Sequence, residues 1–547
     1  MIDLCAARSV RIATLTILIF LTTGYLLSAS TLAFGWRNTF APARIESWPY
    51  VEVVVHDGKE WPYRTFKSSA WMPPNMTITR NEGALAKGYY IFTAKNRRHS
   101  GVLVQSAPVI MTDDNELVYA HDGPYGANNF RVQEVNGKPH LTVWLGESVT
   151  GHGYGQFYTI DETYEVQTSL FSGNVALQSL GAGKKAPGLS DFHEQEMTER
   201  GTVYMVAYNN TQVNLTSIGG KEDGWLSDSL IYEVNMTTGE TLFTWSAKDH
   251  IPLEASKLPI KSYMGDGSKG HPWDHFHINS VQEIGENLLI NSRHTFAMYL
   301  LSRKTGEVLW ELSGRGEGGD FGPLAEADRF KWHHQARAHN VTEDGMTISI
   351  FDNHNMQEDN DTAPTRGLVL RVDLPPDASK PPTVLSSVRG DEPFYVGSQG
   401  SYDPALENGN QLMCYGPVPV IQEFGPNGEV RWEGRFGRDD TVQSYRAFKS
   451  EWHATPADWD PRLHVEKIHD SARQDEQQVE GYVSWNGATD VTGWNVHVRR
   501  GGAWSNMGRA DRKGFETVFR VAAPEGCVVV GAVMDGVEVR RSNEVCL

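Results

Sequence analysis

The sequence predicts an all-β protein, consisting of a six-bladed β-propeller followed by a small β-sandwich of the fibronectin or immunoglobulin type. Three observations support this fold class: short alternating segments closed by turn residues, near-copies of one segment, and a composition with 53 glycines and 16 tryptophans. With 547 residues, the chain is several times longer than a usual single domain, so a large core or more than one domain is expected.

The first of these observations begins near residue 88. From there, segments such as "GYYIFTA", "HLTVWLG", "GTVYMVAY" and "MTISIFDN" alternate apolar and polar residues and end at Gly, Asn or Asp. A period of two over five to eight residues is typical of antiparallel strands. Long segments with helical periodicity are not evident, so the pattern favours strands throughout.

Three segments are close copies of one another: "NMTTGETLFTW" (235–245), "SRKTGEVLWEL" (302–312) and "GPNGEVRWEGR" (425–435). Each has a polar turn, a Gly-Glu pair and a strand that ends near a tryptophan, as expected of one outer hairpin per repeat. The repeat of roughly 60 to 80 residues is longer than the ~40–45 of a compact WD-type blade, which indicates blades with long connections. Residues 45–458 would hold about six blades, and a β-sandwich or β-helix array is the alternative.

The pattern changes after "WHATPADWDP", where residues 462–547 contain at least five closely spaced strand-like segments. This spacing suits a small sandwich domain. Two of the four cysteines, Cys527 and Cys546, lie there, and a local disulfide between them is expected. Cys5 precedes an apolar segment and Cys414 stands alone, so nothing suggests a cysteine nucleophile or a cysteine-based zinc site.

Residues 1–35 have the layout of a secretory signal or an uncleaved signal anchor, because Arg8 and Arg11 precede a long uncharged apolar run. Small residues offer cleavage options, while the length of the run favours an anchor. We therefore expect an extracellular or lumenal protein, membrane-anchored if the segment is retained. N-glycosylation sequons support this route; they lie at Asn75, Asn209, Asn214, Asn235, Asn340 and Asn360.

Acidic residues are spread along the chain, and the net charge is −19 at pH 7. Such a surface repels phosphate backbones, so nucleic acid is not an expected partner.

Candidate site residues come from polar clusters that precede the strands. In "WDHFHINSVQ" (273–282), an extended strand would point His275, His277 and Asn279 to one face. His193 and His334 occupy similar clusters in other repeats, and a propeller brings the inner strands of its blades around one axis. Arg293, in "INSRHTF", adds a planar fork of donors suited to a tetrahedral oxyanion.

A metal site is an alternative for these histidines, since a His-x-His pair can supply two ligands to zinc, iron or copper. A complete metal motif is not evident in the sequence, and the neighbouring arginine would repel a cation. We therefore expect neither a metal nor another cofactor.

The run from residue 73 to "SEWHATP" resembles the fungal branch of the arylsulfotransferase (ASST-like) propeller family, over about residues 60–458. The most specific pieces are "DFHEQEM", "HFHINSV", "INSRHTFAMYLLSRKTGEVLWELSG" and "HHQARAHNVTEDGMTISIFDNHN". The resemblance implies transfer of a sulfuryl group from a phenolic sulfate ester to a phenolic acceptor, through a sulfated histidine and without the nucleotide donor PAPS.

The resemblance also implies roles for residues. His334 of "WHHQA" would become sulfated, and His277 with Asn279 would form the H-x-N pair of the family. Arg293 would be the S-R-H arginine and His193 the D-x-H histidine, both bound to sulfuryl oxygens. Trp273 and Trp332 flank the clusters, and we expect them either to stack on an aryl ring or to pack inside a blade.

Three features depart from the pattern. His333 stands beside His334, which leaves open which of the two faces the axis; His453 stays outside the expected set; and the C-terminal sandwich is an addition. Two other functions remain as alternatives: acid-base chemistry on a secondary metabolite in the same channel, and non-catalytic binding of a glycan or protein.

Overall fold

The computed structural model describes residues 50–56, 59–97, 100–121, 126–149, 151–170, 178–180, 184–186, 190–356, 362–468 and 478–547. The predicted all-β class is confirmed, because these residues form strands and turns with very little helix. In the described ranges, helix is limited to short elements: α1 (Ala247–His250), η1 (Thr216–Ile218), η2 (Leu253–Ala255), η3 (Gly319–Phe321), η4 (Glu326–Asp328) and η5 (Glu407–Gly409).

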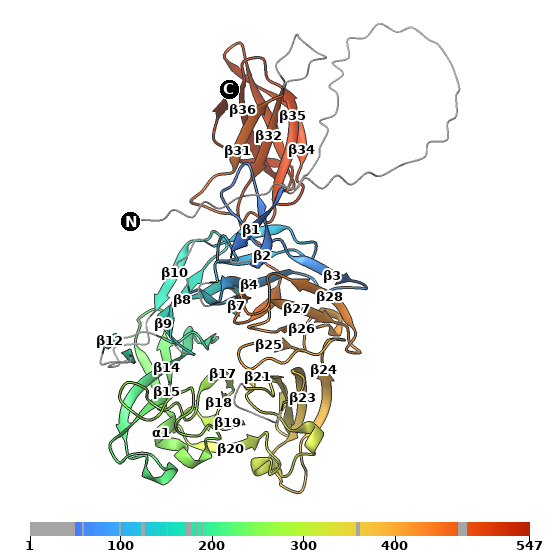
Figure 1. Cartoon of the computed structure of the whole chain (residues 1–547). Helices are drawn as coiled ribbons and strands as arrows, with labels where there is room; N and C mark the ends of the chain where they lie inside the picture. Colours follow the sequence, from blue (N-terminus) through green and yellow to red (C-terminus); the bar gives the residue numbers. More distant parts are fainter. Residues whose placement is uncertain are drawn as a thin grey trace.

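Six antiparallel sheets of four or five strands make up most of the chain (Figure 1). Five of them contain four strands that are neighbours in chain order, and three other strands join their sheets from distant parts of the sequence. The sheets are β4 (Tyr89–Asn96), β5 (Ala107–Met111) and β6 (Leu117–Ala120) with β29 (Val442–Gln443) and β30 (Ala447–Ser450); β7 (Asn128–Val135), β8 (Lys138–Val149), β9 (His152–Ile160) and β10 (Val166–Leu170); β13 (Gln195–Met197), β14 (Thr202–Val213), β15 (Gly224–Asn235) and β16 (Thr241–Ser246); β17 (Ile278–Ile284), β18 (Asn287–Ser292), β19 (Ala297–Ser302) and β20 (Val308–Ser313); β21 (His334–Thr342), β22 (Gly345–Asp352), β23 (Arg366–Asp373) and β24 (Thr383–Val388); and β25 (Ser401–Asp403), β26 (Gln411–Cys414), β27 (Val420–Phe424) and β28 (Val430–Arg435) with β3 (Thr77–Asn81).

The six sheets follow one another in a closed cycle of contacts. The leading strand of a sheet is the first of its four consecutive strands. The leading strands of five sheets contact one another in the order β7, β13, β17, β21 and β25. The cycle is completed by contacts of β26 with β30 and of both β30 and β4 with β7. Three strands from the two ends of this region close the cycle: β3 pairs with β28, while β29 and β30 pair with β4. Backbone hydrogen bonds therefore hold the first and last sheets to their partners from both directions.

The three near-copies in the sequence are the outer hairpins β15–β16, β19–β20 and β27–β28. Each hairpin carries a register shift at the same place, shortly before its turn. The repeated tryptophans Trp245, Trp310 and Trp432 are all buried. The copies were thus correctly predicted as one hairpin per sheet, and each tryptophan contributes a large apolar surface to the core between sheets.

Two other hairpins lie outside the cycle. They are β1 (Tyr50–His56) with β2 (Lys59–Thr65), and β11 (Gln178–Leu180) with β12 (Lys184–Ala186).

The C-terminal residues form two sheets that share one apolar core, with Val483 and Phe519 from one sheet and Val496 and Val530 from the other. The first sheet contains β31 (Arg462–Lys467), β32 (Gln478–Ser484) and β35 (Glu516–Ala522); the second contains β33 (Gly493–Arg500), β34 (Ala503–Asp511), β36 (Cys527–Met534), β37 (Val537–Arg541) and β38 (Val545–Cys546).

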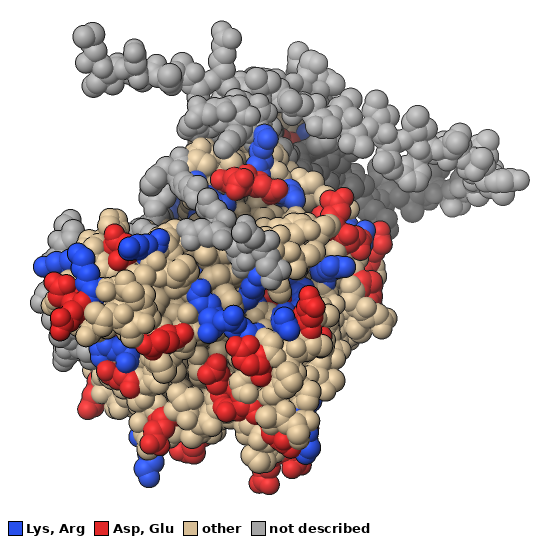
Figure 2. Space-filling model, turned by 60° about the horizontal axis from the view of Figure 1, so that its bottom comes forward, with Lys and Arg blue, Asp and Glu red and all other residues tan. Residues whose placement is uncertain are grey.

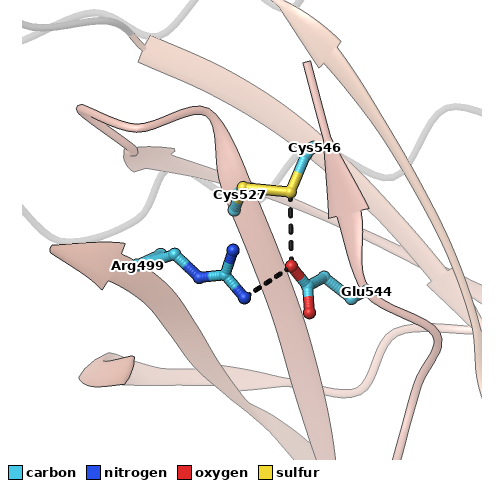
Figure 3. The surroundings of a disulfide bond; sticks show 4 residues. All are labelled: Arg499, Cys527, Glu544 and Cys546. Carbon is cyan, nitrogen blue, oxygen red and sulfur yellow. Dashed lines mark hydrogen bonds and ion pairs between the residues drawn. A yellow bond between two sulfur atoms is a disulfide. The ribbon is translucent and has the colours of Figure 1, made fainter. Parts of the chain in front are cut away.

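The predicted disulfide is confirmed. Cys527 and Cys546 are directly opposite each other on β36 and β38 and are bonded (Figure 3). Beside them, the Glu544 carboxylate pairs with Arg499 at 2.8 Å. The bond ties the last strand to the domain, while Cys414 is a buried free thiol whose pKa burial raises to about 12. Such a thiol is inert, as the sequence suggested.

The C-terminal sheets are docked firmly on the ring of sheets (Figure 1). Ala120 and Asn486 exchange two hydrogen bonds of 3.0 and 2.9 Å between backbone and side chain. The buried Tyr164 hydroxyl donates to the Gly487 carbonyl oxygen at 2.8 Å, and Trp459 packs against the cores of both parts. These contacts fix the orientation of the C-terminal sheets.

Several expectations concern the surface and the N-terminus. Residues 1–35 and Asn360 lie outside the described residues, and among those described no helix is both long and apolar enough to cross a membrane. The other five sequon asparagines are at least partly exposed. Figure 2 shows acidic and basic side chains interspersed over one face of the molecule.

A buried charge cluster lies where the leading strands meet. The fully buried Glu194 carboxylate, just before β13, contacts three guanidinium groups: Arg131 of β7 at 3.3 Å, Arg337 of β21 at 2.6 Å, and Arg446 beside β30 at 3.3 Å. Burial would raise the pKa of Glu194, but Arg337, Arg446 and Arg131 outweigh it and lower the pKa to about 2. One carboxylate thus links four of the six sheets.

This cluster gives a test of stability. Replacing Glu194→Gln leaves three guanidinium groups near the axis without their shared anion, and we expect the free energy of unfolding to fall by ~3–5 kcal/mol. Because the folded pKa of about 2 lies below the ordinary value of 4.5, the wild type should hold this stability above pH 4.5 and lose it as the pH falls toward 2. Urea unfolding midpoints measured across this range check both effects.

Glu196→Gln is the matched control, since Glu196 pairs with the same Arg131 at 2.8 Å but is partly exposed. The free energy of unfolding of the Glu196→Gln variant should fall by less than ~1 kcal/mol. Equal losses for the two variants would contradict a special role for the buried carboxylate.

Candidate active site

Imidazole rings from separate sheets meet in a buried cluster near the axis. The ring centroids of His193 and His277 lie 4.8 Å apart, and those of His277 and His294 lie 4.7 Å apart. Arg293 donates to Nε2 of His294 at 2.8 Å. His334 is close enough for Arg293, His277 and His193 all to act on its pKa. The structure therefore brings the four expected groups, His193, His277, Arg293 and His334, into one site.

The local backbone of the His277 segment differs from the expected strand. β17 begins only at Ile278, and His277 has a left-handed φ of 54°. The expectation that His275, His277 and Asn279 share one face is therefore corrected. His275 lies against Trp273 and Phe276, and neither of its ring nitrogens has a hydrogen-bond partner among the described residues.

Asn279 has its side chain turned toward the next sheet. Its amide donates to the His333 carbonyl oxygen at 2.9 Å, while its oxygen accepts from Asn291 at 2.8 Å and from the Gln335 N–H at 3.3 Å. The structure thus places Asn279 between β17 and β21, where it positions the segment that carries His334.

Asp274 orients two of the histidines. Its buried Oδ2 lies 2.5 Å from Nδ1 of His277 and 3.0 Å from Nε2 of His152. An ionised carboxylate can only accept hydrogen bonds, so both of these nitrogens carry protons. Burial would raise the pKa of Asp274, but the neighbouring imidazoles hold it well below the usual value. His277 consequently presents Nε2 as its unprotonated nitrogen.

His193 has the same arrangement with another acid. Its Nδ1 and its backbone N–H both bond to Oδ1 of the buried Asp191. Asp191 in turn accepts from the Gly153 N–H, which links it to β9. The Asp191 carboxylate therefore fixes the His193 ring and leaves its Nε2 unprotonated in the neutral form.

His334 is oriented by an amide. Its Nδ1 lies 2.7 Å from Oδ1 of Asn353, whose amide nitrogen donates to the Gln399 carbonyl oxygen at 3.0 Å. The Gln399 N–H donates to Nε2 of His334 at 3.2 Å. Together these bonds assign the proton to Nδ1 and the lone pair to Nε2. The neighbouring His333 packs edge-on against Phe330 instead, so His334 is the histidine in the cluster.

Arg293 is buried and held by several groups. Its Nη1 donates to the Tyr263 hydroxyl at 3.1 Å, and its Nη2 donates to the Gly397 carbonyl oxygen at 2.8 Å. The guanidinium lies 5.0 Å from the ring centroid of Trp332, a favourable cation–π contact. Trp332 thus supports the arginine, while Trp273 is buried in the same apolar cluster.

Burial dominates the protonation of these rings. It lowers the pKa of His277 to about 4 against the opposing effect of Asp274, and it also lowers the pKa of His334 well below its usual value, with Arg293 as the next cause. Burial would lower the pKa of His152, but the hydrogen bond to Asp274 and the charges of Asp274 and Asp191 together raise it. Arg293 thus contributes to the lowered pKa of His334, but burial is the larger cause.

Two groups of described residues have donors close enough for a metal, and one of them, Cys527, Glu544 and Cys546, contains the disulfide. The other is His152, Asp274 and His277, with ligating atoms within 4.8 Å of one another. Their spacing is equally that of two imidazole N–H groups donating to one carboxylate oxygen. These hydrogen bonds account for the geometry without an ion.

Sequence reasoning missed the groups that orient the rings. Asp274 and Asp191 stood within the quoted clusters, and a carboxylate three or two residues before a histidine was the available signal. Asn353 stands in the quoted segment "HHQARAHNVTEDGMTISIFDNHN", just after β22, which pairs with the His334 strand β21. His152 and Gln399 come from other parts of the chain and carry no motif that would single them out.

Comparison with protein families agrees with the resemblance noted in the sequence. The model of the arylsulfotransferase (ASST) family matches residues 131–437, more than half of the chain. The search of curated proteins finds no match. Two solved structures have weak likeness at 9% identity: a eukaryotic initiation factor (TM-score 0.19, covering 80% of this chain and 98% of that one) and the S. cerevisiae core factor (TM-score 0.23, covering 84% and 64%).

The pKa shifts predict the state of the rings. At pH 5.5, His277 and His334 should remain neutral with the proton on Nδ1, whereas in the urea-unfolded chain most of both rings should be protonated, since the ordinary value is 6.5. Nitrogen-15 chemical shifts of histidine side chains, assigned with His277→Gln and His334→Gln variants, measure this directly. Protonation of either folded ring near pH 6.5 would contradict the assignment.

Proposed function

The chain belongs to the arylsulfotransferase family, and from this premise we propose that it moves a sulfuryl group from a phenolic sulfate ester to a phenolic acceptor without PAPS. We further propose that the cycle of sheets is a six-bladed propeller spanning residues 45–458, with the site at its axis and an immunoglobulin- or fibronectin-like domain at residues 462–547. The observation that carries the function is His334, which lies in the buried cluster with its lone pair on Nε2, has a lowered pKa, and is close enough to Arg293 to feel its charge.

In the first step, Nε2 of His334 attacks sulfur, the N–S bond forms, and the ester S–O bond breaks with its electron pair leaving on the phenolate. A neutral imidazole is the competent form of the nucleophile, and burial keeps it neutral at the pH of use. Asn353 stabilises the charge that develops on the ring by accepting from Nδ1. An amide oxygen does so without taking the proton.

Arg293 provides positive charge for the sulfuryl oxygens, since sulfuryl transfer, like phosphoryl transfer, depends on positioning and charge stabilisation. In the second step the acceptor phenol attacks sulfur and His334 leaves. The phenolic proton passes to Nε2 of His277 or His193, both of which are oriented by a carboxylate. The carboxylate stabilises the imidazolium that results.

The N-terminal segment and the sequons extend the proposal to location. We propose that the protein enters the secretory route and works in an extracellular or lumenal space, anchored there if residues 1–35 are retained. Small phenolic donors and acceptors are its partners.

The direct test uses the ectodomain and p-nitrophenyl sulfate. We expect release of nitrophenol and a gain of one SO₃ on the peptide that contains His334, read by mass spectrometry. His334→Ala should lower the rate by ~10³-fold or more, because it removes the nucleophile. His333→Leu is the matched control, since His333 packs on Phe330 and should keep most of the activity. Nitrophenol release that is indifferent to His334→Ala would overturn the mechanism.

A second function has specific support: the carboxylate-oriented His193 and His277 are suited to acid-base chemistry that needs no sulfate. Arg293→Lys separates the two. Sulfuryl transfer should fall by ~10²-fold or more when the planar fork is lost, whereas proton transfer should change little. No turnover with any aryl sulfate, in wild type and variants alike, would favour a non-catalytic binding protein.

A further inference from the structure

Tyr263 is the exposed residue that contacts Arg293. It lies in a tight turn between η2 and β17, closed by hydrogen bonds between Ser262 and Gly265 and between Gly265 and Lys261. Its side chain is 48% exposed, although its hydroxyl reaches the buried guanidinium at 3.1 Å. The turn therefore holds a phenol with its ring at the surface and its oxygen inside the site.

The same turn covers His277. The Asp274 N–H donates to the Met264 carbonyl oxygen at 3.1 Å, which ties the turn to the acid that orients His277. A Cβ placed on the exposed Gly151 would lie 3.1 Å from Met264 Cε and 3.9 Å from His277 Cε1. The His277 ring thus lies just beneath the surface formed by Gly151 and this turn.

These contacts place a phenolic oxygen against the group that would bind the sulfuryl oxygens. Arg293 donates to Tyr263, so the phenol oxygen accepts that bond and its own O–H points elsewhere. A sulfuryl group held by the same guanidinium would be close to this oxygen. The chain therefore carries, within the site, the chemical group that the proposed reaction uses as acceptor.

We propose that Tyr263 is an internal acceptor and becomes O-sulfated by the chain's own His334; this inference rests on the proposed function. A lone pair of the Tyr263 oxygen attacks the sulfur of sulfated His334 and the O–S bond forms. The N–S bond breaks, its electron pair returns to Nε2 of His334, and the phenolic proton passes to the neutral His277. An aryl sulfate is the source of the sulfuryl group, and its phenolate is released in the preceding step.

Sulfation of Tyr263 has a consequence for the site. The product is an anion fixed next to Arg293, the same position that a donor sulfate would use. A modified chain should therefore bind the donor more weakly than an unmodified one, and an added phenolic acceptor would keep the chain active by competing for the sulfuryl group.

The stoichiometry of the first turnover tests the proposal. With excess p-nitrophenyl sulfate and no added acceptor, the wild-type ectodomain should release a burst of two equivalents of nitrophenol per chain, one for Tyr263 and one for His334. Tyr263→Phe should halve the burst to one equivalent while still labelling the His334 peptide. The wild type should gain one SO₃ on the peptide that contains Tyr263, and His334→Ala should abolish this label.

Tyr395→Phe is the matched control, because Tyr395 is 57% exposed and should leave the burst at two equivalents. A burst of one equivalent in every chain, with His334 labelled and Tyr263 unmodified, would overturn the internal acceptor and leave the proposed function standing. No nitrophenol release and no label anywhere would overturn both.

Discussion

The buried Glu194 carboxylate is the interaction on which the site depends. Its three guanidinium partners lie in or beside strands of three other sheets, and one of them, Arg337, follows His334 by three residues. Glu194 itself follows His193, Arg446 follows Tyr445, and Tyr445 lies edge-on to His193 with centroids 5.5 Å apart. A shift of any one of these strands would break a buried charge contact, which is strongly unfavourable. The charge cluster therefore sets the relative position of the strands that carry the imidazoles.

Arg446 extends this control to the neighbouring segments. Its Nη2 donates to the Asn279 carbonyl oxygen at 2.7 Å, and the Asn279 side chain holds the His333 carbonyl oxygen and the Gln335 N–H. The backbone on both sides of His334 is thus bonded to β17, and β17 is bonded to the charge cluster. Preorganisation of this kind matters for group transfer, because the reacting nitrogen has to be in line before the bond to sulfur forms.

The sequence predicted the repeated features well and the local geometry poorly. The three hairpins with Trp245, Trp310 and Trp432 were predicted because the same packing problem is solved three times with the same residues. The convergence of His193, His277, Arg293 and His334 was predicted from the recurrence of polar clusters in a propeller, and the resemblance supplied the roles of these residues. The face of His275 was predicted wrongly, because the left-handed φ at His277 and the late start of β17 break the alternation of a strand. Asn353 reaches His334 through the local β21–β22 hairpin, whereas His152 and Gln399 could not be predicted, since only the closed cycle of sheets brings them to the histidines.

The choice of orienting group separates the imidazoles by chemistry. Carboxylates fix the rings of His277 and His193 through Nδ1, and the charge of Asp274 opposes burial, which lowers the pKa of His277 to about 4. The Asn353 amide orients His334 instead; burial, followed by the charge of Arg293, keeps the pKa of His334 well below its usual value against the opposing effect of that hydrogen bond. The short segment from Gly397 to Gln399 occupies both Nη2 of Arg293 and Nε2 of His334. In the proposed reaction a sulfuryl group would use both of these atoms, so its binding would exchange two backbone hydrogen bonds for contacts to its own oxygens and sulfur. The segment from Gly397 to Gln399 satisfies both groups in the structure, and under the proposed function it is the part of the site that would have to move.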